Sequence, residues 1–123
     1  MASSIVANIG GLPPGFENKL NSVKLGYLVE TAENKVYRVE LYMPQAGTLE
    51  TIYYKTLSGT CTIDVAIDGT SITSWSALAV DSTEDNTAST AANTWAGGES
   101  LTIEVTSNSA ALDLQIAIIG TLS

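Results

Sequence analysis

Apolar and polar residues alternate without a break from Cys61 to Asp68. The odd-numbered residues of this stretch are apolar, and the even-numbered ones are polar or small. Side chains point to opposite sides of an extended chain in turn, so this pattern is typical of a β-strand with one buried and one hydrated face. Residues 48–55 predict a second strand, joined to the first by a short turn at Ser58-Gly59. A chain built around such a pair is expected to be a β protein.

Strand-like segments recur at short spacing along the rest of the chain. None shows sustained helical periodicity, and Asp68-Gly69 has the composition of a two-residue hairpin turn. Residues 107–110 predict a loop. The long apolar segment after this loop predicts a strand in the centre of a sheet. About seven or eight strands predict a single all-β, jelly-roll-like (Greek-key) β-sandwich. The further segments are 23–31, 36–43, 101–106, 112–118 and a polar, Thr-rich edge segment, 81–93.

The first 24 residues differ in composition from the rest and predict an N-terminal extended arm, with the sandwich over residues 25–123. Glycines and Pro13-Pro14-Gly15 interrupt any regular element there. One interpretation is a loosely ordered terminus. The other is an arm that buries its apolar side chains against the body or a neighbour, because a hydrated tail does not need them. These interface candidates are Ile5, Val6, Ile9, Leu12 and Phe16.

The segment 48–55 is apolar on both faces of the expected strand, with Leu49 and Tyr53 on one side and Ile52 and Tyr54 on the other. A strand with one hydrated face should be apolar on one side only. Either both faces are covered, or the tyrosines lie at the surface with hydrated hydroxyls. We favour contact with a neighbouring chain, through Leu49, Tyr53 and Tyr54.

Composition excludes several classes of function. The formal net charge is −8 with five Lys and Arg residues, which argues against nucleic acid and anionic membrane surfaces as partners. The absence of histidine excludes a Ser-His-Asp arrangement. The single cysteine, Cys61, excludes a disulfide within the chain and predicts a small buried side chain. We expect no catalytic residue, no cofactor and no metal, and no apolar run approaches the ~20 residues of a membrane span.

The remaining candidates for chemistry have simpler interpretations. Asp64 and Asp68 share a strand face but stand roughly 13 Å apart, too far for a glycosidase pair. The cluster Glu84-Asp85-Asn86 lacks the spacing of a calcium loop. Aromatic residues could form a platform for sugar stacking, although core or subunit contacts are the commoner role. The aromatic candidates are Tyr53, Tyr54, Trp75 and Trp95.

The order of motifs from Gly47 to the end resembles a small β-sandwich domain of tailed-phage structural proteins. The resemblance covers about the last two-thirds of the chain, and the arm lies outside it. Domains of this kind occur in head decoration (cement) proteins and in tail fibres, commonly as trimers. The matching segments are Gly47-Thr48-Leu49, residues 55–63 (KTLSGTCTI), 67–70 (IDGT), 78–83 (LAVDST), 88–93 (ASTAAN) and 97–103 (GGESLTI).

The resemblance implies a non-enzymatic virion structural protein. We expect a capsid decoration or cement protein, made in the host cytoplasm, whose homotrimers bind and stabilise the shell of the major capsid protein, with the arm as one contact. A phage tail-fibre or receptor-binding module and a carbohydrate-binding module are the alternatives, and an enzyme is the least favoured.

Overall fold

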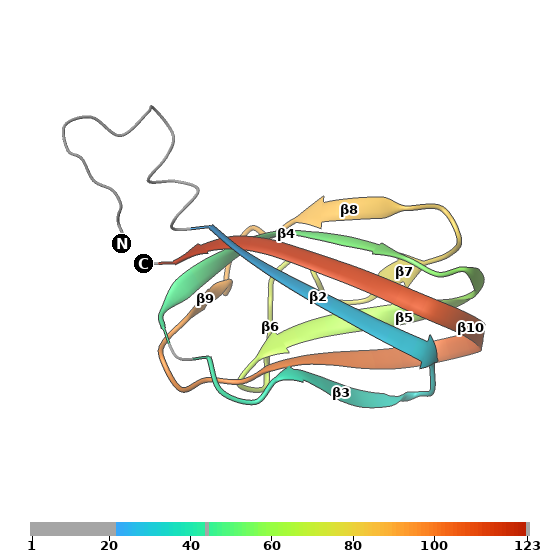
Figure 1. The fold of residues 1–123 in the computed structure, drawn as a ribbon, viewed down its shortest axis with the longest axis horizontal. Helices are drawn as coiled ribbons and strands as arrows, with labels where there is room; N and C mark the ends of the chain where they lie inside the picture. Colours follow the sequence, from blue (N-terminus) through green and yellow to red (C-terminus); the bar gives the residue numbers. More distant parts are fainter. Residues whose placement is uncertain (1–21, 44, 123) are drawn as a thin grey trace, which may run out of the picture.

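Nine antiparallel strands make up the described part of the chain, residues 22–43 and 45–122 of a computed structural model (Figure 1). They confirm the expected all-β class. Within the described ranges there is no helix of the length and apolarity needed to cross a membrane. The strands are β2 (Ser22–Thr31), β3 (Lys35–Glu40), β4 (Gly47–Lys55), β5 (Ser58–Ile67), β6 (Thr70–Ser71), β7 (Leu78–Val80), β8 (Asp85–Ala88), β9 (Thr94–Trp95) and β10 (Leu101–Leu122).

The last strand, β10, is hydrogen-bonded to four others and joins two layers. Its first half, residues 101–106, pairs with β3 and β5, and its second half, residues 112–122, pairs with β2 and β4 (Figure 1). The β3–β5 layer also holds β6 and β7, and the β2–β4 layer also holds β8 and β9. The sheet therefore curls over itself into a β-sandwich consistent with a jelly-roll-like fold. The predicted central position of the last strand is confirmed.

The expected loop at residues 107–110 is instead a bend inside β10. Ser107 and Ala110 have positive φ angles of 49° and 53°, which break the regular register without ending the strand. Asn108 holds the bend with three hydrogen bonds. Its Nδ2 donates to the carbonyl oxygen of Ala32 (2.7 Å), its Oδ1 accepts from the Ala111 N–H (3.1 Å), and its own N–H donates to Asn34 Oδ1 (2.9 Å). The β2–β3 corner is thereby tied to the bend.

A β-bulge in β4 explains why its sequence is apolar on both apparent faces. Thr51 pairs with Ile119 and Leu49 with Gly120, so Glu50 is an extra residue between two successive pairs. The extra residue reverses the alternation, and Leu49 turns to the same interior side as Ile52 and Tyr54. β4 thus has one face buried by the chain itself, and contact of its other face, which carries Tyr53, with a neighbour stays a prediction.

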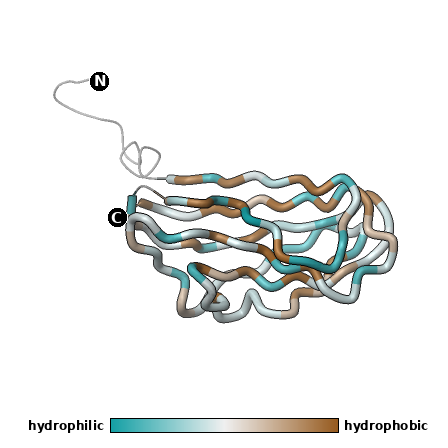
Figure 2. The backbone as a smooth tube through the Cα atoms, turned by 90° about the horizontal axis from the view of Figure 1, so that it is seen from below, coloured by the Kyte–Doolittle hydropathy of each residue, from teal (hydrophilic) through white to brown (hydrophobic). Residues whose placement is uncertain are grey.

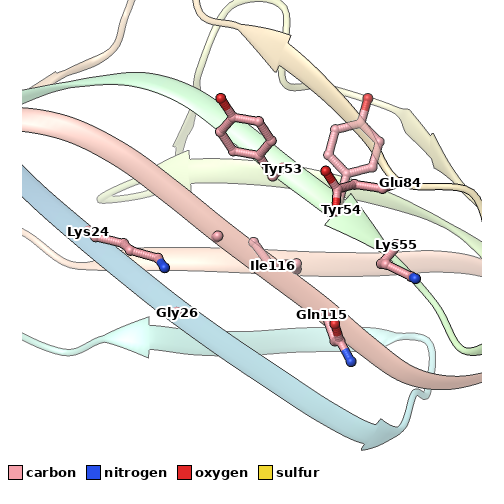
Figure 3. Close-up of a pocket in the computed structure, with 9 residues that line it drawn as sticks. Lys24, Gly26, Tyr53, Tyr54, Lys55, Glu84, Gln115 and Ile116 are labelled. Carbon is pink, nitrogen blue, oxygen red and sulfur yellow. The ribbon is translucent and has the colours of Figure 1, made fainter.

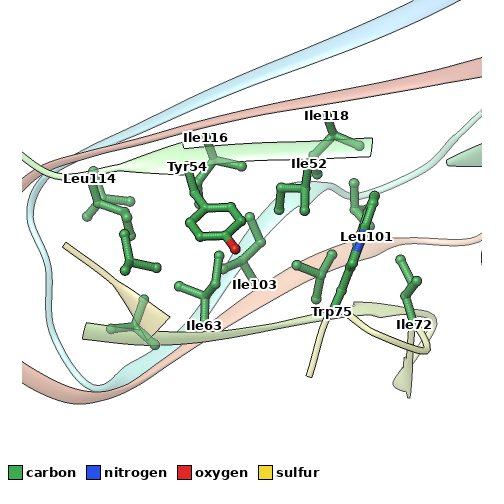
Figure 4. Close-up of a cluster of buried hydrophobic side chains, with 14 of the residues drawn as sticks. Ile52, Tyr54, Ile63, Ile72, Trp75, Leu101, Ile103, Leu114, Ile116 and Ile118 are labelled. Atoms are coloured by element: carbon green, nitrogen blue, oxygen red, sulfur yellow. The ribbon is translucent and has the colours of Figure 1, made fainter. Parts of the chain in front are cut away.

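The interior between the two layers is filled by aliphatic side chains. Figure 2 shows apolar and polar residues alternating along the strands, and Figure 4 shows the inward-facing residues of β4, β5 and β10 meeting around Trp75. The Tyr54 hydroxyl lies 2.8 Å from Thr87 Oγ1 and the Trp75 indole N–H donates to the Thr87 carbonyl oxygen (3.0 Å), so both aromatic polar groups are paired. The largest aromatic side chains of the core are therefore buried with their polar groups hydrogen-bonded.

Local predictions agree with the structure at one turn and one edge strand, and they differ at two places. Ser58-Gly59, expected to form a turn, lies at the start of β5. Asp68 and Gly69 have positive φ angles of 49° and 89° and join β5 to β6, as expected for a two-residue hairpin. β8 lies at a sheet edge, inside the segment predicted for an edge strand. β2 begins at Ser22, so residues 22–24, assigned to the arm from sequence, are paired with β10.

Candidate interaction surfaces

Four of the predicted interface residues lie in the core instead of at the surface. Leu49, Tyr54, Trp75 and Trp95 are all buried by the chain itself, so the expectation that they contact a neighbour does not hold. Trp75 packs between the layers, and Trp95 covers Gly47 while its indole N–H donates to the Gln45 carbonyl oxygen. Neither indole ring offers an exposed face for a sugar to stack on.

Tyr53 is the predicted interface residue that the structure places at the surface, where 38% of it is exposed. Successive side chains of a strand point to opposite faces, so Tyr53 points outward from β4 while its neighbours Ile52 and Tyr54 point inward. The five candidates in the N-terminal segment lie outside the described residues: Ile5, Val6, Ile9, Leu12 and Phe16.

Tyr53 stands beside a shallow hollow on the outer face of the β2–β4 layer (Figure 3). Ala117 of β10 pairs with Gly26 of β2 on one side and with Tyr53 on the other. Small residues next to a ring leave an open space of about 270 Å³ above the sheet. We call this space the Tyr53 hollow. It offers a protruding side chain of another molecule an aromatic wall and an apolar floor.

Apolar side chains continue around the Tyr53 hollow. Ile119, half-buried, lies one outward position along β10 from Ala117, and Leu28 of β2 is 53% exposed. An outer face of a sandwich is ordinarily polar, because alternation sends the apolar residues inward. An apolar row on the outside of a filled sandwich is typical of a surface that meets another protein.

The outer face of the β3–β5 layer is more polar, although Val36 of β3, 56% exposed, also lies on it beside a hollow of about 360 Å³. Its equivalent central row is Arg38, Thr102, Ala66 and Ser71, and beside it Glu104 lies directly opposite Asp64. Asp64 accepts hydrogen bonds from the Ser71 (2.7 Å) and Ser76 (2.9 Å) hydroxyls. Like charges opposite each other are unfavourable unless water screens them, so this face suits contact with solvent.

Positive charge is concentrated at the Tyr53 hollow. The described part of the chain has four cations, and two of them, Lys24 and Lys55, line the hollow on opposite sides. Gln115 and Glu84 complete its polar rim. In a chain with a formal net charge of −8, this arrangement favours an acidic partner surface at the hollow over a basic one.

Of the groups considered for covalent or metal chemistry, Glu84 lines the Tyr53 hollow, whereas Cys61, Asp64 and Asp68 lie away from it. Cys61 is buried between the layers, as predicted, and burial raises the pKa of its thiol. No group of three or more metal-ligating side chains occurs within residues 22–43 and 45–122. Asp64 and Asp68 do not meet, and the carboxylate that Asp64 faces is Glu104.

Sequence reasoning missed Gly26, Ala117, Ile119 and the two lysines, which join Tyr53 only across strands. Their signal was present in part: Ile119 breaks the alternation of the last strand, because Ala117 is followed by two isoleucines in succession. Lys24 and Lys55 can be placed at one hollow only when the order of the strands in the sheet is known. Alternation within a single strand does not reveal that order.

Comparison with protein-family models and with curated proteins finds no match to this chain. Among solved structures, the fold is similar to a chain of the structure described as "Cyanophage Pam1 capsid asymmetric unit". The alignment covers 100% of both chains with a TM-score of 0.52 and 18% sequence identity. At this identity the similarity establishes a shared fold over the whole length of both chains.

Proposed function

We propose that this chain is a non-enzymatic virion structural protein, a decoration (cement) protein that binds the shell of the major capsid protein as a trimer and stabilises it. It would be made in the host cytoplasm and act on the capsid surface. The observation that carries the proposal is the full-length similarity in fold to a chain of a phage capsid.

The surfaces of the molecule support an adhesive role. The core is already filled, yet the outer face of the β2–β4 layer presents Tyr53, Ile119 and Leu28 to solvent. The Tyr53 hollow would receive a side chain of the shell, and Lys24 and Lys55 would face carboxylates around it. Aromatic residues at the centre and charged residues at the rim are the usual arrangement of a protein interface.

A reconstitution experiment tests the proposal. Shells of the major capsid protein that lack this chain are incubated with the purified protein, imaged by electron microscopy and heated. We expect ordered density at symmetric positions and a higher temperature of shell disruption. Light scattering of the free protein measures its mass. Absence of binding to shells contradicts the decoration role, and a monomeric mass on shells and in solution contradicts the trimer.

The alternatives are distinguished by where the protein is found. Density in the tail would favour the tail-fibre or receptor-binding role. The carbohydrate-binding alternative loses its main support, because Trp75 and Trp95 are buried and Tyr53 is the exposed member of the predicted platform. A glycan-binding module commonly needs an exposed ring face.

A further inference from the structure

One long edge of the β2–β4 layer is open within the described residues. β2 pairs with β10 along one side without a register shift, and no strand of residues 22–43 and 45–122 pairs with its other side. The opposite edge of the layer is formed by β8 and β9, which have four and two residues. Short strands, charges, prolines and bulges are the usual protection of a sheet edge. β2 has ten residues, no proline and no bulge, so its outer side is suited to pairing with another strand.

The neighbouring edge strand, β3, is protected in the usual way. It has six residues, and three of them are charged: Lys35, Arg38 and Glu40. Its register with β10 also shifts between Leu101 and Thr102. β2 carries two charged residues in a strand almost twice as long. Between the two edges on this side of the sandwich, β2 is therefore the one open to a further strand.

The charges of β2 are placed for pairing with a second copy of the same strand. Lys24 and Glu30 lie three residues before and three residues after Tyr27. When two copies of β2 pair antiparallel about a two-fold axis at Tyr27, Lys24 of each copy lies directly opposite Glu30 of the other. Opposite charges at such positions stabilise a strand pair, and like charges destabilise it. No other symmetric antiparallel register aligns these two charges.

Both charges are available for this contact. Neither Lys24 nor Glu30 forms an ion pair with any residue in the ranges 22–43 and 45–122. Both side chains are exposed and stand on the outer face of the strand. A two-fold axis perpendicular to the sheet keeps outward residues opposite outward residues, so the two ion pairs would form on one face.

The same register is complementary in shape. It sets Leu28 of each copy opposite Gly26 of the other. Leu28 is 53% exposed, and a Cβ placed on Gly26 would meet nothing within 4 Å, so a projecting side chain faces an open position twice. On the inner face, Leu25 lies opposite Val29 and Tyr27 lies opposite its own copy. Leu25 and Tyr27 are half-buried in the single chain, and the pairing would cover them further.

We infer that the outer side of β2 is a contact between two copies of this chain, an antiparallel β2–β2 pair centred on Tyr27 that joins two β2–β4 layers into one sheet. Addition of a strand at an open edge is a common mode of recognition, and two-fold contacts are the commonest between identical chains. The inference concerns the free protein and does not rest on the capsid role. Its two-fold symmetry does not build the proposed trimer, and it would join two trimers through one copy of each.

The pair would also complete the Tyr53 hollow. Across the sheet, the outward row Tyr53, Ala117 and Gly26 continues to Leu28 of the second copy. The hollow then has an aromatic side chain on one side and an aliphatic one on the other. Lys24, which lines the hollow, is shared between the hollow and Glu30 of the second copy.

A charge-swap cycle tests the pairing in the free, full-length protein. Sedimentation velocity at rising concentration should show a reversible doubling of mass. Lys24→Glu places a carboxylate opposite Glu30 twice in each pair, and Glu30→Lys places an ammonium group opposite Lys24 twice. Each single variant should therefore weaken the doubling by about tenfold or more. The double variant Lys24→Glu, Glu30→Lys exchanges the charges and should restore it to nearly the original strength.

The double variant distinguishes this contact from any effect within one chain. Lys24 and Glu30 stand roughly 20 Å apart along the strand, too far to interact directly, so restoration requires a second copy. Lys55→Glu, on β4, is the matched control, because it makes the same change of charge away from the edge and should leave the doubling unchanged. Glu30→Lys lowers the net negative charge, which alone would favour association, whereas the pairing predicts that association weakens.

The inference is overturned if the mass does not double, if the single variants associate like Lys55→Glu, or if the double variant is as weak as the single ones. Circular dichroism establishes that each variant is folded. Hydrogen exchange of the unmodified protein gives a test that needs no variant. Amides on the outer side of β2 should exchange more slowly at high protein concentration than at low, and exchange that is independent of concentration would also overturn the inference.

Discussion

The side-chain amide of Asn108 donates a 2.7 Å hydrogen bond to the carbonyl oxygen of Ala32, 76 residues earlier in the chain. This bond joins the bend of β10 to the corner between β2 and β3, so two segments cross from one layer of the sandwich to the other together. The corner between β4 and β5 runs alongside, where the Leu57 N–H donates to the Leu112 carbonyl oxygen (2.9 Å). The two layers are thus connected by three adjacent crossings.

We predict that Asn108→Ala lowers the free energy of unfolding by about 2–3 kcal/mol, because it removes two side-chain hydrogen bonds and leaves the polar backbone groups of Ala32 and Ala111 without partners. Urea denaturation measures the change. Asn86→Ala is the matched control, since the side chain of Asn86, on β8, makes no hydrogen bond within the described residues. An equal effect of the two variants would show that Asn108 does not hold the bend.

Gly120 should not tolerate a side chain, because a Cβ there would overlap the carbonyl oxygen of Thr48 opposite the bulge in β4. Gly120→Ala is expected to cost about 2–3 kcal/mol of stability, the usual range for overpacking. The loop after β8 holds the bulge from its other side: the Ser89 hydroxyl (2.6 Å) and the Asn93 amide (3.1 Å) both donate to the Leu49 carbonyl oxygen. The backbone around position 120 therefore has little room to move and relieve the overlap.

Gly26→Ala is the matched control for Gly120→Ala. A Cβ at position 26 meets nothing within 4 Å, and its backbone is compatible with an L-residue. Alanine reduces the entropy of the unfolded chain, so stability should stay equal or rise by up to about 1 kcal/mol. Thermal unfolding of the two variants side by side measures the difference. A loss at position 26 as large as at position 120 would contradict the bulge geometry.

The stability of the protein should fall as pH rises above about 9. Burial raises the pKa of the Cys61 thiol above its ordinary value of 9.0, so the folded protein keeps the thiol protonated where the unfolded chain ionises it. The stabilisation is therefore fully present below the unfolded pKa and is lost as pH rises toward the folded one. Urea titrations between about pH 7 and 10 should show this slope, and Cys61→Ala should remove it. A slope that persists in the variant would assign it to other groups.

The strands were predictable where one feature repeats locally, as in the alternation from Cys61 to Ile67 and in the Asp68-Gly69 turn. The errors arose where one residue changes the geometry. Glu50 adds a single position to β4 and moves Leu49 from the apparent outer face to the core. Nothing in its side chain signals this, because the bulge is imposed by the pairing with Gly120 and the loop that holds Ser89.

The candidate site was predictable only through Tyr53. The sequence left Trp75 and Trp95 open between core or subunit contacts, the commoner role, and a sugar-stacking platform. Packing between distant segments decides burial, and both rings are enclosed by residues far from them in the chain. The hollow itself exists because Gly26 and Ala117, from β2 and β10, happen to be neighbours of Tyr53 across the sheet.

Binding to the shell should weaken as salt rises, because Lys24 and Lys55 line the Tyr53 hollow and an acidic partner surface would be screened from them. Titration of shells with the protein at about 50 and 300 mM salt measures this dependence. The double variant Lys24→Gln, Lys55→Gln should bind more weakly and with a flatter salt dependence, whereas Lys35→Gln, on β3, is the control. An identical salt dependence in all three proteins would show that the contact lies elsewhere.

The most direct test of the central claim, that the chain attaches to a shell through the outer face of the β2–β4 layer, compares two Ala→Glu variants. Ala117→Glu fills the Tyr53 hollow with a carboxylate, and Ala66→Glu places the same side chain on the outer face of the β3–β5 layer. Occupancy on shells is measured by electron microscopy, after both variants are shown to fold. We predict at least a tenfold loss of affinity for Ala117→Glu, equal to about 1.4 kcal/mol, and normal occupancy for Ala66→Glu. Normal occupancy of Ala117→Glu, or loss in Ala66→Glu alone, would contradict it.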